Sequence, residues 1–214
     1  MTRRRAGLLL ALGLLAGGLW QLGEAGYIHA KALLAQYLLR SAWAETLATA
    51  AAPETRSAAA IHMVEPALTP TRHVRPWPWA DTWPVARLRV PRLDEDLIVL
   101  AGASGRTLAF GPGLHDGGAA PGAPGHTIIT AHRDTHFSFL RFLYPGDEVR
   151  LTVADGRELT YRVRGTRIVR VDRARLVTDT DENLLTLVTC YPFDAIDAGT
   201  PLRFLVTAVA ADSI

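Results

Sequence analysis

Short apolar segments separated by turns fill the second half of this chain, and they constrain its fold more than any other feature. Each segment is four to eight residues long and rich in valine, isoleucine, leucine and threonine, a composition typical of β-strands. A turn at Ala154-Asp155-Gly156 joins two of them as a hairpin. About eight strands with little helical pattern between them predict an all-β domain, either a closed β-barrel or a sandwich. The expected strands cover residues 85–90, 97–100, 127–130, 148–153, 158–163, 167–171, 184–190 and 202–209.

The N-terminus has a different character. Arginines at positions 3–5 precede residues 6–22, and no charge follows until Glu24. A bilayer core needs about 17–25 apolar residues, and arginines on one side only predict that the body of the protein lies outside. We therefore expect residues 1–24 to form an uncleaved signal anchor, a transmembrane helix. A cleaved signal peptide is the alternative, although the Ala-x-Ala triplet at 30–32 lies well past the apolar segment.

Two segments connect this anchor to the strands. Residues 25–50 carry apolar side chains near a period of 3.6, which predicts an amphipathic juxtamembrane helix. Residues 51–78 contain five prolines and few large apolar side chains, as expected of a linker. The β-rich domain would then span residues 79–214. Trp77, Trp79 and Trp83 stand at its start, and we expect them to close one end of it, because exposed indole rings are costly.

Composition excludes several classes of protein. The net charge is only +2, and no run of basic residues interleaved with aromatics follows the N-terminus, so nucleic acid is a poor candidate partner. One cysteine in 214 residues excludes an intramolecular disulfide and a zinc site built on cysteine pairs.

That single cysteine, Cys190, ends a predicted strand, and two other reactive residue types occupy similar positions. His132 directly follows the strand at 127–130, and Arg203 begins the last strand. The 13 residues between Cys190 and Arg203 fit two adjacent antiparallel strands joined by the loop 191–201, so we expect the two residues to be neighbours at one rim.

Each of the three residues has an ordinary explanation when taken alone. A lone cysteine is most often a small buried hydrophobe, a histidine after a strand is often a cap, and an arginine in a strand is usually solvated. Together they supply what acyl transfer requires: a thiol, a base or imidazolium beside it, and fixed N–H donors for the developing oxyanion.

The sequence around these residues resembles the sortase family. TLVTCYPF at 186–193, AHRDTHFSFL at 131–140 and PLRFLV at 201–206 are similar to the cysteine, histidine and arginine segments of sortases, in the same order. WPWADTWPV at 77–85, LAFGPG at 108–113 and the pattern from Lys31 to Trp43 resemble sortases of Gram-negative proteobacteria in particular. The resemblance extends over about residues 76–210.

This resemblance implies a closed sortase-like β-barrel of about eight strands with short helices and loops. It also implies roles: Cys190 as nucleophile, His132 as general acid and base, and Arg203 as the group that binds substrate carbonyls and the oxyanion. Substrate contacts are expected from Thr189, Ala131 and His136. Many Gram-positive sortases have glycine where this chain has Ala131, which alters backbone freedom beside the base but removes no catalytic group.

The implied activity is a cysteine transpeptidase that cleaves an LPxTG-like sorting signal between Thr and Gly and passes the acyl group to an amine. The implied partner is a secreted protein with a C-terminal sorting signal and a von Willebrand factor A domain, and the implied location is the bacterial inner membrane, with the catalytic domain on the periplasmic side.

No cofactor is expected. The acidic residues Asp179, Asp181 and Glu182 could ligate calcium, although a solvated acidic loop is the favoured interpretation. The His132-x-x-x-His136 spacing resembles a zinc motif, but the expected Glu is Arg133 and the segment follows a strand.

Three alternatives from other classes remain open. The same residues would serve a peptidase that uses water as acceptor. A membrane-tethered binding barrel without catalysis would bury Cys190 in an unreactive state. A cysteine L,D-transpeptidase would carry an SHGC-type motif, which is absent here.

Overall fold

The computed structural model describes residues 2–51, 73–173, 180–195 and 199–211. Most of the expected linker, residues 52–72, lies outside this part of the chain. In sequence order the elements are α1 Thr2–Ala51, β1 Pro84–Val90, η1 Pro91–Leu93, β2 Glu95–Leu100, α2 Gly105–Leu108, β3 Gly113–Leu114, β4 His126–Thr130, η2 Ser138–Phe142, β5 Glu148–Val153, β6 Glu158–Arg170, β7 Leu184–Tyr191 and β8 Leu202–Ala210.

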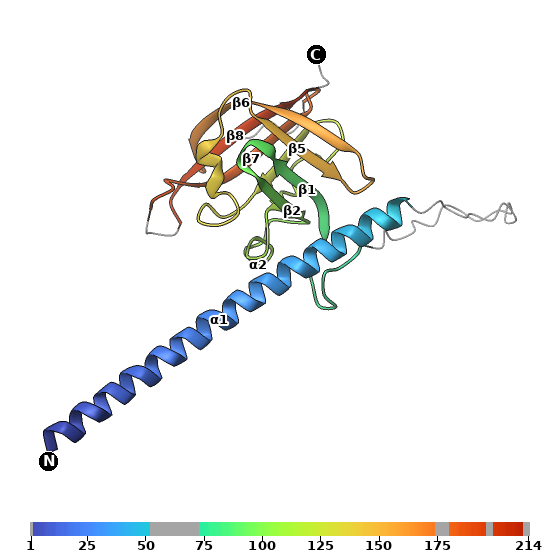
Figure 1. Ribbon diagram of the computed structural model, residues 1–214. Helices are drawn as coiled ribbons and strands as arrows, with labels where there is room; N and C mark the ends of the chain where they lie inside the picture. Colours follow the sequence, from blue (N-terminus) through green and yellow to red (C-terminus); the bar gives the residue numbers. More distant parts are fainter. Residues whose placement is uncertain (1, 52–72, 174–179, 196–198, 212–214) are drawn as a thin grey trace, which may run out of the picture. The chain divides into compact units, whose positions relative to one another are not determined.

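The strands close into a barrel (Figure 1), and their order around it is β1-β2-β3-β4-β7-β8-β6-β5. The pairs are antiparallel except β2–β3 and β4–β7, which are parallel. The predicted barrel of about eight strands is confirmed, with two differences in its parts. Residues 158–163 and 167–171 were expected as separate strands but belong to the single long strand β6, and the two-residue strand β3 was not expected.

Alternating side chains fill the barrel. In β1 the apolar residues point inward and the arginines Arg87 and Arg89 point outward, so buried and half-buried positions alternate along the strand. The same alternation puts Val149 and Leu151 of β5 into the core, where Leu187 of β7 is also buried. The period-2 pattern of the sequence therefore fixes which face of each strand is available for a site.

Strand β4 is buried at four of its five residues, and the segment before it runs along its edge. His115 donates its backbone N–H to the Ile128 carbonyl, and Ala119 donates to the His126 carbonyl. A side chain at Gly118 would lie 2.8 Å from that same His126 carbonyl, so the close approach of the loop requires glycine there.

Helix α1 belongs to two units. Residues 1–38 form one compact unit and residues 39–214 the other, so the last turns of α1 belong with the barrel. In that second unit Leu39 and Trp43 pack against Ile98 and Leu100 of β2 in a cluster outside the barrel. The helix runs without interruption through the boundary expected near residue 25.

In the described part of α1, no stretch is both long and apolar enough to cross a membrane. The side chains of residues 2–12, which make up much of the expected signal anchor, are not among those described.

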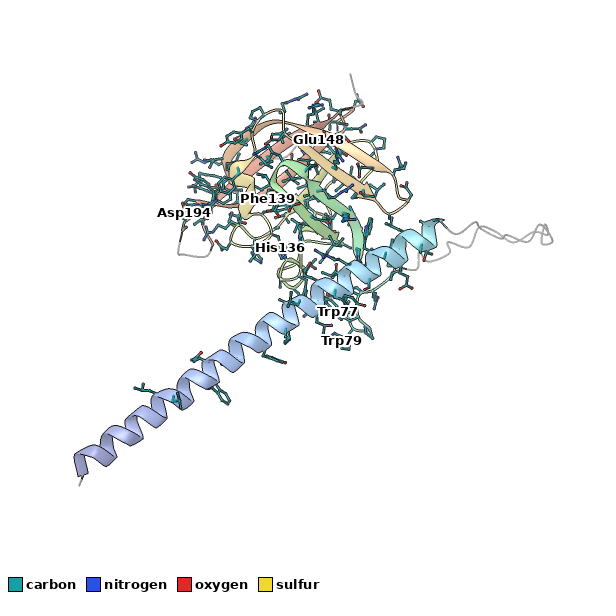
Figure 2. The ribbon with its side chains drawn as sticks, viewed as in Figure 1. Trp77, Trp79, His136, Phe139, Glu148 and Asp194 are labelled. Carbon is teal, nitrogen blue, oxygen red and sulfur yellow. The ribbon has the colours of Figure 1, made fainter. Side chains whose placement is uncertain are left out.

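The three tryptophans before β1 behave differently from one another, and two of them, Trp77 and Trp79, are labelled in Figure 2. Trp77 packs edge-on against Phe110, with ring centroids 4.9 Å apart, and Trp83 stacks on His73 at 4.0 Å. Trp79 is 82% exposed, so the expectation that all three close one end of the domain is wrong for this residue.

Candidate active site

Cys190 and Arg203 lie directly opposite each other in the β7–β8 ladder. The 13-residue spacing predicted this neighbourhood, and the register of the two antiparallel strands confirms it. Cys190 is a free thiol and is half-buried. Arg203 is half-buried as well, so both side chains remain within reach of solvent.

His132 follows β4, which lies on the opposite side of β7 from β8. Thr130, the last residue of β4, pairs with Val188 of β7 in parallel register. The pairing continues past the strand end, since the Ala131 N–H donates to the Val188 carbonyl at 3.2 Å and the Thr189 hydroxyl donates to the Ala131 carbonyl at 2.7 Å. If this register is extended two residues beyond Thr130 and Val188, it aligns His132, which lies past the end of β4, with Cys190.

The three residues lie on the outer face of the barrel. Ile129, Leu187 and Val206 point into the core, and residues at odd offsets from them point outward. Cys190 and Arg203 are three residues from Leu187 and Val206, and His132 is three residues from Ile129. His132, Cys190 and Arg203 thus form one row across β4, β7 and β8, with neighbouring strands about 4.8 Å apart. We call these three residues the catalytic row.

Thr189 and Ala131, predicted as substrate contacts, lie beneath this row on the inner face. Both are buried, and the hydrogen bond between them joins the ends of β4 and β7. Their role as substrate contacts stays a prediction.

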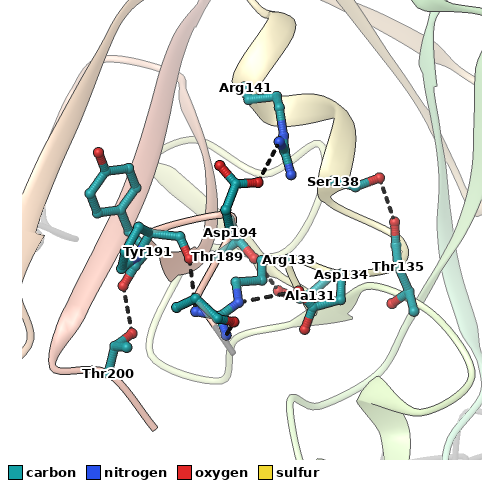
Figure 3. Close-up of polar contacts among 12 residues, drawn as sticks. Ala131, Arg133, Asp134, Thr135, Ser138, Arg141, Thr189, Tyr191, Asp194 and Thr200 are labelled. Atoms are coloured by element: carbon teal, nitrogen blue, oxygen red, sulfur yellow. Dashed lines mark hydrogen bonds and ion pairs between the residues drawn. The ribbon is translucent and has the colours of Figure 1, made fainter. Parts of the chain in front are cut away.

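The Arg203 guanidinium is anchored on one side. Its Nη1 donates to the carbonyls of Thr200 at 2.6 Å and of Leu202 at 2.9 Å. The Thr200 hydroxyl in turn donates to the Tyr191 carbonyl at 2.5 Å, which ties the loop back to β7 (Figure 3). Within the described part of the chain Nε and Nη2 make no hydrogen bond, so these donors remain for a ligand.

His136, the third predicted substrate contact, lies close enough to His132 to feel its charge. Burial lowers the pKa of His136 from the ordinary 6.5, and the neighbouring His132 lowers this pKa further. His136 is therefore neutral at pH 7, which leaves His132 free of a second positive imidazole beside it.

Arg133, between the two histidines, was not predicted as part of the site. Its side chain is buried, and it donates from Nη1 to the Pro192 carbonyl at 2.8 Å and from Nη2 to the Ala195 carbonyl at 2.7 Å. Its Nε also pairs with the carboxylate of Asp134 at 3.2 Å (Figure 3). A basic residue in a polar loop gives no sequence signal of burial, so only the fold reveals this contact.

The predicted calcium ligands do not form a site among the described residues. Asp179 lies outside them, and Glu182 pairs with Arg164 at 3.3 Å. In the described ranges no group of three acidic, histidine or cysteine side chains is arranged to hold a metal ion.

A sequence model of the sortase domain matches residues 88–211, more than half of the chain. The chain therefore belongs to the sortase family. It is 31% identical over 120 residues to Sortase D of Bacillus subtilis (strain 168), an alignment that spans 56% of this chain and 60% of that relative's length.

Solved sortase structures share the fold. Sortase A from Corynebacterium diphtheriae superposes with a TM-score of 0.57 at 26% identity, over 83% of this chain and 84% of that one. Sortase C-1 from Actinomyces oris gives a TM-score of 0.51 at 31% identity, over 60% of this chain and 74% of the other. The barrel is thus that of a sortase.

Proposed function

We propose that this protein is a membrane-anchored cysteine transpeptidase that cleaves an LPxTG-like sorting signal and transfers the acyl group to an amine. The observation that carries the proposal is the catalytic row: a free thiol flanked in one register by an imidazole and a guanidinium. Family membership supports the same chemistry.

The first half-reaction forms a thioester. Sγ of Cys190 attacks the carbonyl carbon of the substrate threonine, and the oxyanion that develops receives N–H bonds from the unoccupied edge of Arg203. The C–N bond to glycine then breaks as the His132 imidazolium gives its proton to the departing amine.

The second half-reaction releases the acyl group. An amine nucleophile loses its proton to His132 and attacks the thioester carbonyl, and Cys190 leaves as a thiolate. His132 is again an imidazolium at the end, so the cycle closes without any further group. The half-buried position of Cys190 allows this approach from the outer face.

Substitution of Cys190 provides the direct test. The full chain is incubated with an LPxTG-type peptide, with and without an amine, and covalent acyl-enzyme is detected by intact mass. We expect a thioester adduct in the wild type and none in Cys190→Ala. Cleavage of the peptide by Cys190→Ala would show that another residue is the nucleophile.

The same assay separates the alternatives. A peptidase would release free acid at the same rate whether or not amine is added, whereas a transpeptidase would give the amide product. A binding barrel without catalysis would leave Cys190 unmodified both by the peptide and by a methanethiosulfonate reagent. The half-buried thiol favours catalysis over a binding barrel, and family membership supports transfer to an amine over hydrolysis.

The proposed location is the inner membrane, with the barrel on the periplasmic side. The arginines at positions 3–5 and the apolar segment that follows support this orientation. The proposed partner is a secreted protein with a C-terminal LPxTG-like signal, of the kind that carries a von Willebrand factor A domain. Cell fractionation tests the location, since the full chain should sediment with membranes and a variant lacking residues 1–38 should not.

A further inference from the structure

We propose that Arg133 is a positioning residue that holds His132 in line with Cys190 by fastening the histidine loop to the segment that leaves the cysteine strand. The proposal rests on the function proposed above, because it assigns Arg133 a role in the same acyl transfer. Arg133 binds main-chain carbonyls and acts through its neighbour His132.

The contacts of Arg133 join the two halves of the site. Pro192 and Ala195, whose carbonyls it binds, follow Cys190 by two and five residues, and Arg133 directly follows His132. One guanidinium thus bridges the backbone beside the base and the backbone beyond the nucleophile. Because the bonds go to main-chain carbonyls, they fix the path of the segment itself and not merely one side chain.

The position of His132 depends on such a tether. Strand β4 ends at Thr130, and Ala131 is the last residue bonded to β7. On its other side His132 is held through its carbonyl, which accepts the Phe137 N–H at 3.0 Å. Between these points the loop leaves the sheet, and the fork of Arg133 is its direct connection to the chain after Cys190.

Burial of this charge is difficult to explain by stability alone. Arg133 is 5% exposed, and both of its Nη atoms donate to main-chain carbonyls. An apolar side chain of equal volume often serves stability as well as a buried charged residue does. A fixed bidentate geometry is what an apolar side chain cannot supply.

Arg141 offers a contrast within the same region. Its guanidinium lies over the Phe193 ring at 4.7 Å and pairs with Asp194 at 3.1 Å, but that carboxylate is 90% exposed. An exposed ion pair contributes little and holds no backbone in place. Arg141 touches the same segment as Arg133 without fixing its path.

The test is a double-mutant cycle in which the measured quantity is the reactivity of the Cys190 thiol, so no substrate is needed. The rate of Cys190 alkylation by iodoacetamide is measured against pH for the wild type, His132→Ala, Arg133→Met and the double variant, all as full chains. We expect Arg133→Met to change the pH profile toward that of His132→Ala, and to change nothing further once His132 is absent. A wild-type profile in Arg133→Met, or independent effects of the two substitutions, would overturn the proposal.

Peptide turnover gives the second readout. We expect Arg133→Met to lower kcat about tenfold or more while KM stays within about threefold, because misplacement of the base slows the chemistry and leaves binding intact. Arg133→Lys can reach one carbonyl at most, so its kcat should lie between those of the wild type and Arg133→Met. This variant replaces Arg133→Met in the experiment if Arg133→Met does not fold. An equal loss in kcat for Arg141→Met would show that general loosening of the segment is the cause.

The two proposals fail in different ways. If the wild type forms no acyl-enzyme with any LPxTG-type peptide, the proposed function is wrong, and the alkylation cycle still decides the role of Arg133. If the wild type is active and the effects of His132→Ala and Arg133→Met on alkylation simply add, only the inference about Arg133 is wrong.

Discussion

At the scale of single residues, the guanidinium of Arg203 is oriented by hydrogen bonds within the protein. Nη1 of its guanidinium donates to the carbonyls of Thr200 and Leu202. Because the guanidinium is planar and rigid, these bonds also fix the orientation of Nε and Nη2. The fork is therefore preorganised, which is the condition under which a donor stabilises an oxyanion most strongly.

Arg203→Lys tests this arrangement. Lysine keeps the charge but loses the fork, so kcat should fall by about 100-fold, with a smaller change in KM. Steady-state kinetics with an LPxTG-type peptide measure the effect. Arg170→Lys is a matched control, because Arg170 forms a comparable fork with Asp172 on the exposed surface of β6 and should lose no activity.

His136 makes stability depend on pH. Its pKa in the folded protein is lower than the ordinary 6.5, so as the pH falls the unfolded chain takes up this proton first and stability decreases. His136→Gln should therefore flatten the decline in the free energy of unfolding between about pH 7 and pH 5. Urea titrations at several pH values measure the slope, and a slope equal to that of the wild type would contradict the prediction.

At the scale of elements, the sequence predicts some parts of the site better than others. The β7–β8 register followed from one spacing, because two antiparallel strands joined by a single loop have few ways to pair. The β4–β7 pair is parallel and its partners are far apart in the chain, so no spacing reveals that the strand before His132 lies beside the strand of Cys190. Their common row is a product of the closed barrel.

Other elements escaped prediction for local reasons. Strand β6 is expected as two strands because Arg164, Gly165 and Thr166 interrupt its apolar pattern, yet β8 pairs with it on both sides of that point, with a shift of register between Val163 and Gly165. Strand β3 is too short to carry any pattern. The burial of Arg133 depends on carbonyls some 60 residues away, and no local rule predicts it.

The contact between the end of α1 and β2 should contribute measurably to the free energy of unfolding. Trp43 is buried in the cluster with Leu39, Ile98 and Leu100, so Trp43→Ala should lower the free energy of unfolding by about 3 kcal/mol. Chemical denaturation measures this loss. Trp79→Ala, which removes an exposed ring, should change stability by less than about 0.5 kcal/mol.

At the scale of the whole molecule, the two compact units predict where the chain can be shortened. A protein of residues 39–214 keeps Leu39 and Trp43 and should unfold at the temperature of the full chain. A protein that begins at residue 52 loses this cluster and should melt at a lower temperature. Thermal unfolding compares the two, and equal melting temperatures would show that the helix end does not support the barrel.

The place of β8 in the barrel has a consequence for biosynthesis. This last strand pairs with both β6 and β7, and it also brings Arg203 beside Cys190. A growing chain therefore carries its thiol for some time before the sheet around that thiol can close. The thiol and the guanidinium can therefore meet only after β8 has emerged from the ribosome, so the site cannot be complete before that strand is made.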